Sequence, residues 1–392
     1  MKILFLSFYF PPDLSAGSFR SSSLVNALCS HLPDDLEIEV ITTLPNRYST
    51  FNEEAPAFET QNDVLICRIP VPQHKSGMID QSKLYLAFAR GTLQHIANKN
   101  YDLVYATSGR LMTAVLGAYI ARKLRKPLYL DIRDIFVDTI RDVLPKLIVS
   151  PVLPFLFLVE KYAINTAGKV NLVSPGFLPY FEKRYPSQEF SFCTNGIDTE
   201  FLKSRPTPST SNAPRPLTVL YAGNIGEGQG LEKIIPKLAA HYQGELTFTI
   251  VGDGGRKKQL EKELATLGCD NVTLSKPVKR DQLIKLYQDA DILFLHLNDY
   301  PAFKKVLPSK LFEYAAVGKP IWAGVSGYAA DFTAKNITNA AVFDPGDLDQ
   351  AVKSFANLEL VTMVRDEFSK KFARENIMRE LAEDIVKLSL KS

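Results

Sequence analysis

The sequence predicts an α/β protein built from two Rossmann-like, doubly wound halves. Apolar runs of strand length alternate with segments of helical periodicity from Lys2 onward, and the same alternation restarts at Leu217. The 392 residues exceed one typical domain and suffice for two, each with a full core. Sheets of this kind bind ligands beyond the carboxyl ends of their strands, so we searched the loops that follow the strands for function.

The composition argues against several classes of protein. With 46% hydrophobic and 23% charged residues the chain resembles a soluble protein, and a net charge of +3 argues against a nucleic-acid binder. The four cysteines lie too far apart in the sequence for a disulfide framework or a paired metal site. The N-terminal apolar run is short and lacks a small-residue cleavage site, so we expect a buried first strand in a cytoplasmic protein.

The first half begins with a strand, a glycine-containing loop and a helix. The strand is expected at Lys2–Phe8 and the loop at Tyr9–Ser18, where Gly17 permits close approach of a ligand; Arg20 follows as the helix begins. A plain turn explains this loop about equally well. Further strands are expected at Glu37–Thr43, Val64–Arg68, Leu103–Ala106, Pro127–Leu130 and Val170–Val173, with helical spacing over Ser82–Ala97 and Leu111–Leu124.

A cluster of charged residues, Asp131, Arg133 and Asp134, comes at the end of one expected strand. An α/β sheet places functional groups there, so the cluster is a candidate for contact with a substrate. The alternative is an Asp–Arg salt bridge that only fixes a loop.

The segment Leu144–Val159 is strongly apolar but contains Pro145, Pro151 and Pro154. It is shorter than a membrane-spanning helix, and its prolines argue against an undisturbed span. It is either a core helix or a partly exposed ridge that contacts a bilayer with basic residues nearby.

The second half restarts after Arg205–Pro216, a Pro/Ser/Thr-rich segment that predicts a linker and the domain boundary. A strand at Leu217–Tyr221 leads into a loop with four glycines, Ala222–Gly230, whose backbone N–H groups can approach a diphosphate; a tight turn is the alternative. Strands at Leu246–Gly252, Val272–Leu274, Ile292–His296 and Ile321–Ala323 and helices at Leu231–Ala240, Asp281–Gln288 and about Glu367–Leu390 complete the pattern.

The stretch Leu307–Gly324 carries the sharpest functional signal. Pro308 and Ser309 predict a helix start, with Ser309 as cap, and Gly318 predicts the end near Val317. The helix N-terminus and Lys310 together suit a phosphate. Glu313 in the next turn suits two hydroxyls of a sugar, and phosphate plus diol indicates a nucleotide.

This stretch is similar to the donor-site helix of retaining, GT-B-fold glycosyltransferases of family 4, especially those of bacterial surface-polysaccharide assembly. That family has two glutamates eight residues apart; Glu313 matches the second, which holds the ribose, and Lys305 replaces the first. Asn224 and Gln229 replace the Arg and Lys that the family's glycine loop holds against the diphosphate. Lys310, alone or together with Lys304 or Lys305, is then expected to supply the charge.

The resemblance covers nearly the whole chain and implies an acceptor domain over 1–198, a donor domain over 199–372 and a helix over 373–392 that returns to the first domain. The implied candidates fall into two groups, catalytic and donor-binding. The catalytic ones are Gly17, Asp131, Arg133, Asp134 and Lys310, and the donor-binding ones are Arg20, Gly223, Asn224, Gly226, Gln229, Gly252, Asp253, Val278, Lys305, Leu307, Pro308, Ser309, Lys310, Leu311 and Glu313.

The activity implied is retaining, metal-independent transfer of a sugar from a UDP- or GDP-linked donor to a glycan or lipid-linked acceptor in O-antigen- or capsule-like biosynthesis. No cofactor, metal or nucleic acid is expected, and residues 144–159 are expected to allow peripheral contact with the inner face of the plasma membrane. The rivals are a nucleotide-sugar 2-epimerase of the same fold and a non-catalytic scaffold protein.

Overall fold

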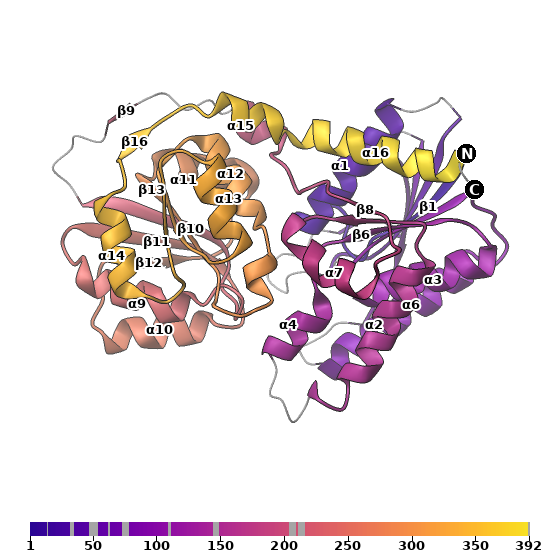
Figure 1. Cartoon of the computed structure of the whole chain (residues 1–392), viewed down its shortest axis with the longest axis horizontal. Coiled ribbons are helices and arrows are strands. Elements are labelled where there is room, and N and C mark those ends of the chain that lie inside the picture. Colours follow the sequence, from indigo (N-terminus) through magenta and orange to yellow (C-terminus); the bar gives the residue numbers. More distant parts are fainter. Residues whose placement is uncertain are drawn as a thin grey trace. The chain divides into compact units, whose positions relative to one another are not determined.

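The computed structural model describes the chain except for residues 14, 32–34, 47–53, 62, 73–77, 109–110, 144–148, 204–208, 211–215 and 391–392. The chain forms two compact units (Figure 1). Unit 1 comprises Met1–Asn195 with Glu375–Ser392, and unit 2 comprises Gly196–Arg374.

Unit 1 is organised around an eight-stranded sheet in the order β3-β4-β2-β1-β5-β6-β7-β8. Its neighbouring strands are parallel except for β3 and β4. Helices α1 and α16 lie on one face, and α2, α3 and α6 lie on the other (Figure 1). The bounds are β1 Lys2–Leu6, α1 Ala16–His31, β2 Glu37–Thr43, β3 Phe58–Gln61, β4 Val64–Ile69, α2 Met78–His95, β5 Leu103–Thr107, α3 Leu111–Leu124, β6 Leu128–Ile132, α4 Phe136–Val143, α6 Leu153–Thr166, β7 Lys169–Leu172, α7 Leu178–Arg184, β8 Phe190–Ser191 and α16 Arg374–Leu390.

Unit 2 contains a six-stranded, fully parallel sheet in the order β12-β11-β10-β13-β14-β15. One core layer packs under α9, α10 and α14, and the other packs under α8, α11, α12, α13 and α15. The bounds are α8 Thr199–Lys203, β10 Leu217–Asn224, α9 Leu231–His241, β11 Leu246–Asp253, α10 Lys257–Thr266, β12 Val272–Ser275, α11 Arg280–Asp289, β13 Ile292–His296, α12 Ser309–Val317, β14 Ile321–Gly324, α13 Tyr328–Asn336, β15 Ala340–Phe343, α14 Leu348–Ala356 and α15 Asp366–Lys371.

The predicted α/β class is confirmed in each unit. The central strands are almost continuous runs of apolar residues because helices cover both faces of the sheet; Ile3, Leu4, Phe5 and Leu6 of β1 are all fully buried. The antiparallel edge strand β3 was not predicted, since Phe58–Gln61 is short, polar and mostly exposed.

The units divide three residues before the boundary between 198 and 199 that the resemblance implied, and the boundary predicted from composition within Arg205–Pro216 lies too late in the chain. The break between the units comes earlier, at Asn195 and Gly196, so the Pro/Ser/Thr-rich segment lies inside unit 2. Its short strand β9 (Ser209–Thr210) pairs antiparallel with β16 (Val361–Thr362) of the same unit. Among the described helices, none is both long and apolar enough to cross a membrane.

Candidate active site

The candidate phosphate helix α12 has the predicted bounds, but its N-terminus is built differently. Pro308 occupies the N-cap in an extended conformation, Ser309 is the first helical residue, and no described side chain caps the helix. The capping role predicted for Ser309 is therefore wrong, because its hydroxyl already lies inside the first turn. At the other end Gly318 adopts the left-handed conformation (φ 81°) that ends helices. The N–H groups of the first turn are thus not satisfied by a side-chain cap.

Two of the donor-binding candidates on this helix are core residues. Leu307 and Leu311 are buried in the apolar layer behind α12, with 2% and 0% of their surface exposed. Their side chains cannot contact a ligand, so these two residues could bind the donor only through main-chain atoms. Their burial instead fixes how α12 packs on the sheet.

Lys310 projects from α12 to the end of β10. A β-carbon at Gly223 would clash with Lys310 Nζ, and Gly223 has a positive φ of 149°. The ammonium also lies 5.7 Å from the ring centroid of Tyr221. Burial lowers the pKa of Lys310, and nearby Glu313 counteracts the shift. The structure therefore brings the predicted cation to the predicted glycine loop.

Glu313 lies one turn further along α12 and is half-buried. It accepts a hydrogen bond of 3.2 Å from Tyr287 Oη. Burial raises its pKa, and the positive charges of Lys310 and Arg280 oppose this shift. A partly desolvated carboxylate with one oxygen bonded to a tyrosine retains acceptor capacity for hydroxyl groups.

Arg280 is a residue near this carboxylate that the sequence analysis did not single out. It begins α11, two residues after the half-buried candidate Val278, and forms an ion pair with Asp198. Arg374 also pairs with Asp198, at 3.0 Å. The signal in the sequence was weak, because a lone Arg at the start of a helix is common.

The glycine loop after β10 exposes main chain and two mutually bonded amides. Asn224 Nδ2 donates to Gln229 Oε1 at 2.9 Å. Gly226 lies directly against this bond, because a β-carbon there would displace the Asn224 amide. Gly252, at the end of the neighbouring strand β11, packs directly against the carbonyl of Gly223. The candidate Asp253 has a local role, because its Oδ1 accepts from the N–H of Gly254 at 2.8 Å.

Several polar side chains hold the glycine loop in place, and sequence reasoning did not identify them. Glu227 pairs with Arg256 and accepts from Tyr300 Oη, and these bonds lower its pKa although burial opposes them. Asn298 Nδ2 donates to the carbonyl of Glu227 at 3.0 Å. Arg256 is thus already engaged by a carboxylate within the fold.

His296 provides a further support for the same loop. Its Nδ1 bonds the carbonyl of Gln229 at 2.6 Å, and its Nε2 accepts from the N–H of Gly346 at 3.0 Å. This pattern requires the neutral ring with its proton on Nδ1. Burial lowers the pKa of His296 to about 4, so the neutral form persists at physiological pH.

The lysines upstream of α12 differ in their surroundings. Lys304 is exposed and pairs with Asp299 at 3.1 Å. Lys305 ends a short 3₁₀ turn, Phe303–Lys305, and is half-buried.

In unit 1 the first loop and the charged cluster do meet. A β-carbon at Gly17 would clash with the Arg133 guanidinium, so the two candidates are in direct contact. The main chain of Arg133 is fixed by a bond of 3.1 Å to Ser108 Oγ. Asp134 follows as an exposed residue. Gly17, Arg133 and Asp134 therefore form one surface at the carboxyl end of β6.

Arg20 and Asp131 are fully buried and bind each other instead of a ligand. Arg20 Nε and Nη2 donate to the two carboxylate oxygens of Asp131 at 2.7 and 2.9 Å, and the guanidinium also bonds the carbonyls of Cys193 and Thr194. Although burial opposes it, Arg20 lowers the pKa of Asp131. Donor binding by Arg20 and catalysis by Asp131 are thus corrected: the pair is the structural salt bridge considered as the alternative, with Arg20 as its cation.

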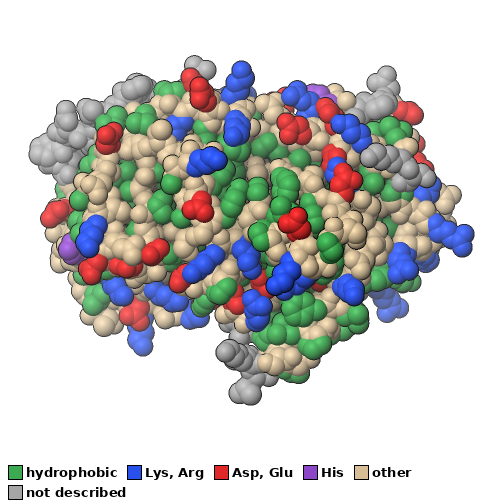
Figure 2. Space-filling model, in the orientation of Figure 1, with side chains coloured by type: hydrophobic (Ala, Val, Ile, Leu, Met, Phe, Trp, Pro, Cys, Tyr) green, Lys and Arg blue, Asp and Glu red, His purple; other side chains and the backbone are tan. Residues whose placement is uncertain are grey.

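Of the apolar segment 144–159, Val149–Val159 lies within the described residues, and its part from Leu153 onward forms the start of α6. Val152, Phe155 and Leu158, three residues apart, are 40%, 56% and 64% exposed, whereas Leu156 is 8% exposed and packs in a core cluster. We call these three residues the α6 ridge. On the side of unit 1 that carries α4 and α6, hydrophobic side chains lie among those of Lys and Arg in the space-filling view (Figure 2).

Comparison with known proteins defines the class first. Over 99% of this chain and 98% of its own, WaaG, a glycosyltransferase involved in lipopolysaccharide biosynthesis, superposes with a TM-score of 0.65 at 15% identity. Anabaena HepE, solved in complex with UDP, superposes with a TM-score of 0.59 at 17% identity over 100% of this chain and 98% of its own. The fold is therefore GT-B, with two Rossmann-like domains.

The sequence comparisons match part of the chain. Residues 207–375 match the glycosyl transferases group 1. A putative colanic acid biosynthesis glycosyl transferase of Escherichia coli K12, WcaI, is 31% identical over 173 residues, which are 43% of this chain and 42% of that protein. The match thus spans less than half of this curated relative. The match to the glycosyl transferases group 1 over residues 207–375 agrees with the resemblance of the α12 segment.

Proposed function

We propose that the protein is a retaining glycosyltransferase that moves a sugar from a UDP- or GDP-linked donor to a glycan or lipid-linked acceptor in cell-surface polysaccharide assembly. One observation carries the proposal: Lys310 and the start of α12 meet the glycine loop at Gly223, and Glu313 follows one turn later. A cation and free N–H groups suit a diphosphate, and the carboxylate suits the ribose diol.

The donor half of the mechanism follows from these groups. As the bond between the sugar and the diphosphate breaks, negative charge grows on the departing phosphate oxygen. Lys310 and the N–H groups of the loop and helix stabilise that charge, which is the task a metal performs in other transferases. We propose that transfer needs no metal, because Lys310 supplies the positive charge.

The acceptor half is assigned to the surface of Gly17, Arg133 and Asp134 in unit 1. In a front-face reaction, the acceptor oxygen bonds to the anomeric carbon on the face that the phosphate leaves, and its proton passes to the departing phosphate oxygen. The protein then positions the two substrates more than it reacts with them.

Peripheral membrane contact through the α6 ridge is part of the same proposal. Arg141 and Lys161 precede and follow the ridge in the sequence and are exposed, and Arg141 also pairs with Asp138 and Asp142. Exposed apolar side chains bordered by basic groups suit an anionic lipid surface, where a lipid-linked acceptor would be found.

Incubation with a panel of radiolabelled UDP- and GDP-sugars and lipid-linked acceptors tests the proposal. Transfer with retention of anomeric configuration, unaffected by a chelator, supports it. Isomerisation of the nucleotide sugar would instead identify a 2-epimerase. If the protein bound neither UDP nor GDP, a scaffold protein would be favoured.

A further inference from the structure

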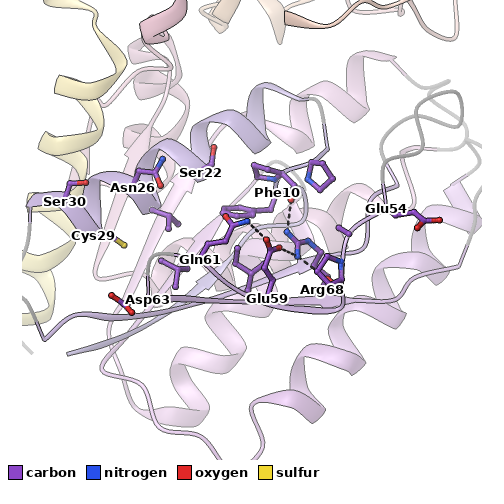
Figure 3. A pocket seen from close by; sticks show the side chains of 17 residues that line it. Phe10, Ser22, Asn26, Cys29, Ser30, Glu54, Glu59, Gln61, Asp63 and Arg68 are labelled. Atoms are coloured by element: carbon purple, nitrogen blue, oxygen red, sulfur yellow. Dashed lines mark hydrogen bonds and ion pairs between the residues drawn. The ribbon is translucent and has the colours of Figure 1, made fainter.

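Unit 1 contains a pocket of about 830 Å³ that the proposed reaction does not use (Figure 3). Its walls are α1, the β3–β4 hairpin and the segment Phe10–Pro12 of the first loop. Neither Gly17 nor Arg133 lines it.

The floor of the pocket is apolar because of strand alternation. Cys67 and Ile69 of β4 contact α2 on one face of the sheet. Val64, Ile66 and Arg68 therefore point to the other face, where they line the pocket. Val64 and Ile66 lie at the base of the pocket beside α1, with only 3% and 2% of their surface exposed.

Planar polar groups form one edge of the pocket. Arg68 Nη1 donates to Glu59 Oε2 at 2.6 Å, and Gln61 Nε2 donates to the other oxygen of the same carboxylate. The Arg68 guanidinium also bonds the carbonyls of Pro11 and Pro56, at 3.0 and 3.1 Å. It is 4% exposed, so its charge is committed to the fold.

The charge of the pocket disfavours anions. Glu54 and Asp63 add two carboxylates to Glu59, against the single, engaged guanidinium of Arg68. The hydrogen bond from Arg68 lowers the pKa of Glu59, which therefore stays ionised. A phosphate or an acidic sugar would be repelled.

Amide and hydroxyl side chains complete the lining. Asn26, Ser22 and Ser30 present them from α1, and Gln61 faces them from β3 (Figure 3). Groups of this kind both donate and accept, as sugar hydroxyls do, and an apolar floor suits the C–H face of a sugar ring.

We propose that this pocket binds a neutral glycan segment, namely the part of the acceptor distant from its reacting end. That the bound glycan is the acceptor rests on the proposed function. The bond from Arg68 to the Pro11 carbonyl joins the pocket to the first loop, so a glycan whose end lies at that loop can extend along α1. The pocket would then select acceptors by length and by absence of charge.

Cys29 gives a direct test that needs no nucleotide sugar. It is exposed on α1 and lines the pocket, while Cys269 in unit 2 is partly exposed and serves as internal reference. Burial and Asp63 raise the pKa of Cys29, so alkylation by iodoacetamide is followed at about pH 9, where thiolate forms. Mass spectrometry reports the rate at each cysteine.

The probes are neutral hexasaccharides of glucose, galactose, mannose and N-acetylglucosamine, with hexagalacturonate and spermidine as charged counterparts. A neutral probe at twice its Kd should slow alkylation of Cys29 by about threefold and leave Cys269 unchanged, since the free fraction is 1/(1 + [L]/Kd). Protection by no neutral probe, or stronger protection by hexagalacturonate or spermidine, overturns the proposal.

Two matched variants check that the pocket itself is responsible. Gln61→Ala removes a polar group of the lining and should weaken the protecting probe about 2- to 10-fold, the scale of one hydrogen bond. Thr60→Ala, on the opposite face of the same exposed strand, should leave the affinity unchanged. Equal effects of the two variants would overturn the proposal.

The test is independent of the proposed function. If a neutral glycan protects Cys29 but no sugar is transferred from any nucleotide, the pocket binds a glycan and that glycan is not an acceptor. If transfer occurs and no neutral probe protects Cys29, the pocket assignment alone is wrong.

Discussion

Replacing Lys310 by alanine removes the cation that the proposed mechanism places beside the departing diphosphate. The side chain is held by α12 and reaches the main chain of Gly223, and it is half-buried. Neither Asn224 nor Gln229 can replace its charge, because both are neutral and bond each other. The substitution deletes no core side chain, so we expect the fold to survive.

The size of the effect follows from the contact with Gly223. A phosphate on the main chain of Gly223 would lie near Nζ, and two unit charges about 4 Å apart at an effective dielectric of about 20 interact by about 4 kcal/mol. Water that enters the space left by the side chain recovers part of this energy. We therefore expect turnover to fall roughly 10²- to 10³-fold, as when one preorganised transition-state donor is removed.

The assay is kcat with the donor identified from the nucleotide-sugar panel, together with calorimetry of UDP or GDP binding. Lys310→Gln should recover little, because it restores a hydrogen bond without the charge. Lys304→Ala is the matched control: that lysine is exposed and pairs with Asp299, so kcat should change little.

A Lys310→Ala enzyme within about threefold of wild type would refute the reasoning, since a lost transition-state contact must appear in kcat. Arg20 could not then be the substitute, because it is fully buried against Asp131. Arg256 pairs with Glu227 as Arg280 pairs with Asp198, so it would need the same test as the two groups named next. Arg280 and Lys305 would become the groups to test.

Three further results are expected. Glu313→Gln should weaken binding of the nucleotide diphosphate by about 1.5–3 kcal/mol in calorimetry, because it loses a charge-assisted bond to the ribose; unchanged affinity would remove Glu313 from the site. The double variant Phe155→Ser and Leu158→Ser should lose binding to anionic vesicles in flotation assays, whereas Leu267→Ser, an exposed apolar residue of unit 2, should not; equal binding by all variants contradicts the membrane contact. Between pH of about 6.5 and 4 the unfolded chain binds a proton at His296 that the folded chain does not. The free energy of unfolding therefore decreases as the pH is lowered, and at pH 5 it should be about 2 kcal/mol less than at neutral pH. Urea denaturation should show that this loss is smaller in His296→Gln, and an identical pH dependence would contradict the buried neutral ring.

Local signals predicted much of the fold. The bounds of α3 and α12 follow from helical spacing and from the glycine that ends α12, and the apolar strands follow from burial on both faces. The edge strand β3 was not predicted, because it is short, mostly polar and shows no periodic pattern of apolar residues. The unit boundary was misplaced because composition reports exposure, and it does not report which core a segment joins.

The candidate site shows the same division. Lys310 and Gly223 were predicted separately, and their contact is a tertiary fact that no spacing contains. Arg20 failed for the same reason: its partner Asp131 is 111 residues away, so the sequence could not tell a ligand-binding guanidinium from a buried one. The supports of the glycine loop, Glu227 and His296 among them, come from separate strands and loops and carry no motif.

The membership of α16 in unit 1 has a consequence for how the chain folds during synthesis. Met378, Leu381 and Ile385 of this helix are fully buried, and Asp384 binds Tyr129 and Lys169 of the sheet. Ribosomes complete unit 2, a continuous segment, before they make the residues that finish the core of unit 1. The segment synthesised first is therefore the last to close, and until residue 385 emerges a strip of the unit 1 sheet stays uncovered. Premature termination after unit 2 should leave unit 2 folded beside an aggregation-prone unit 1.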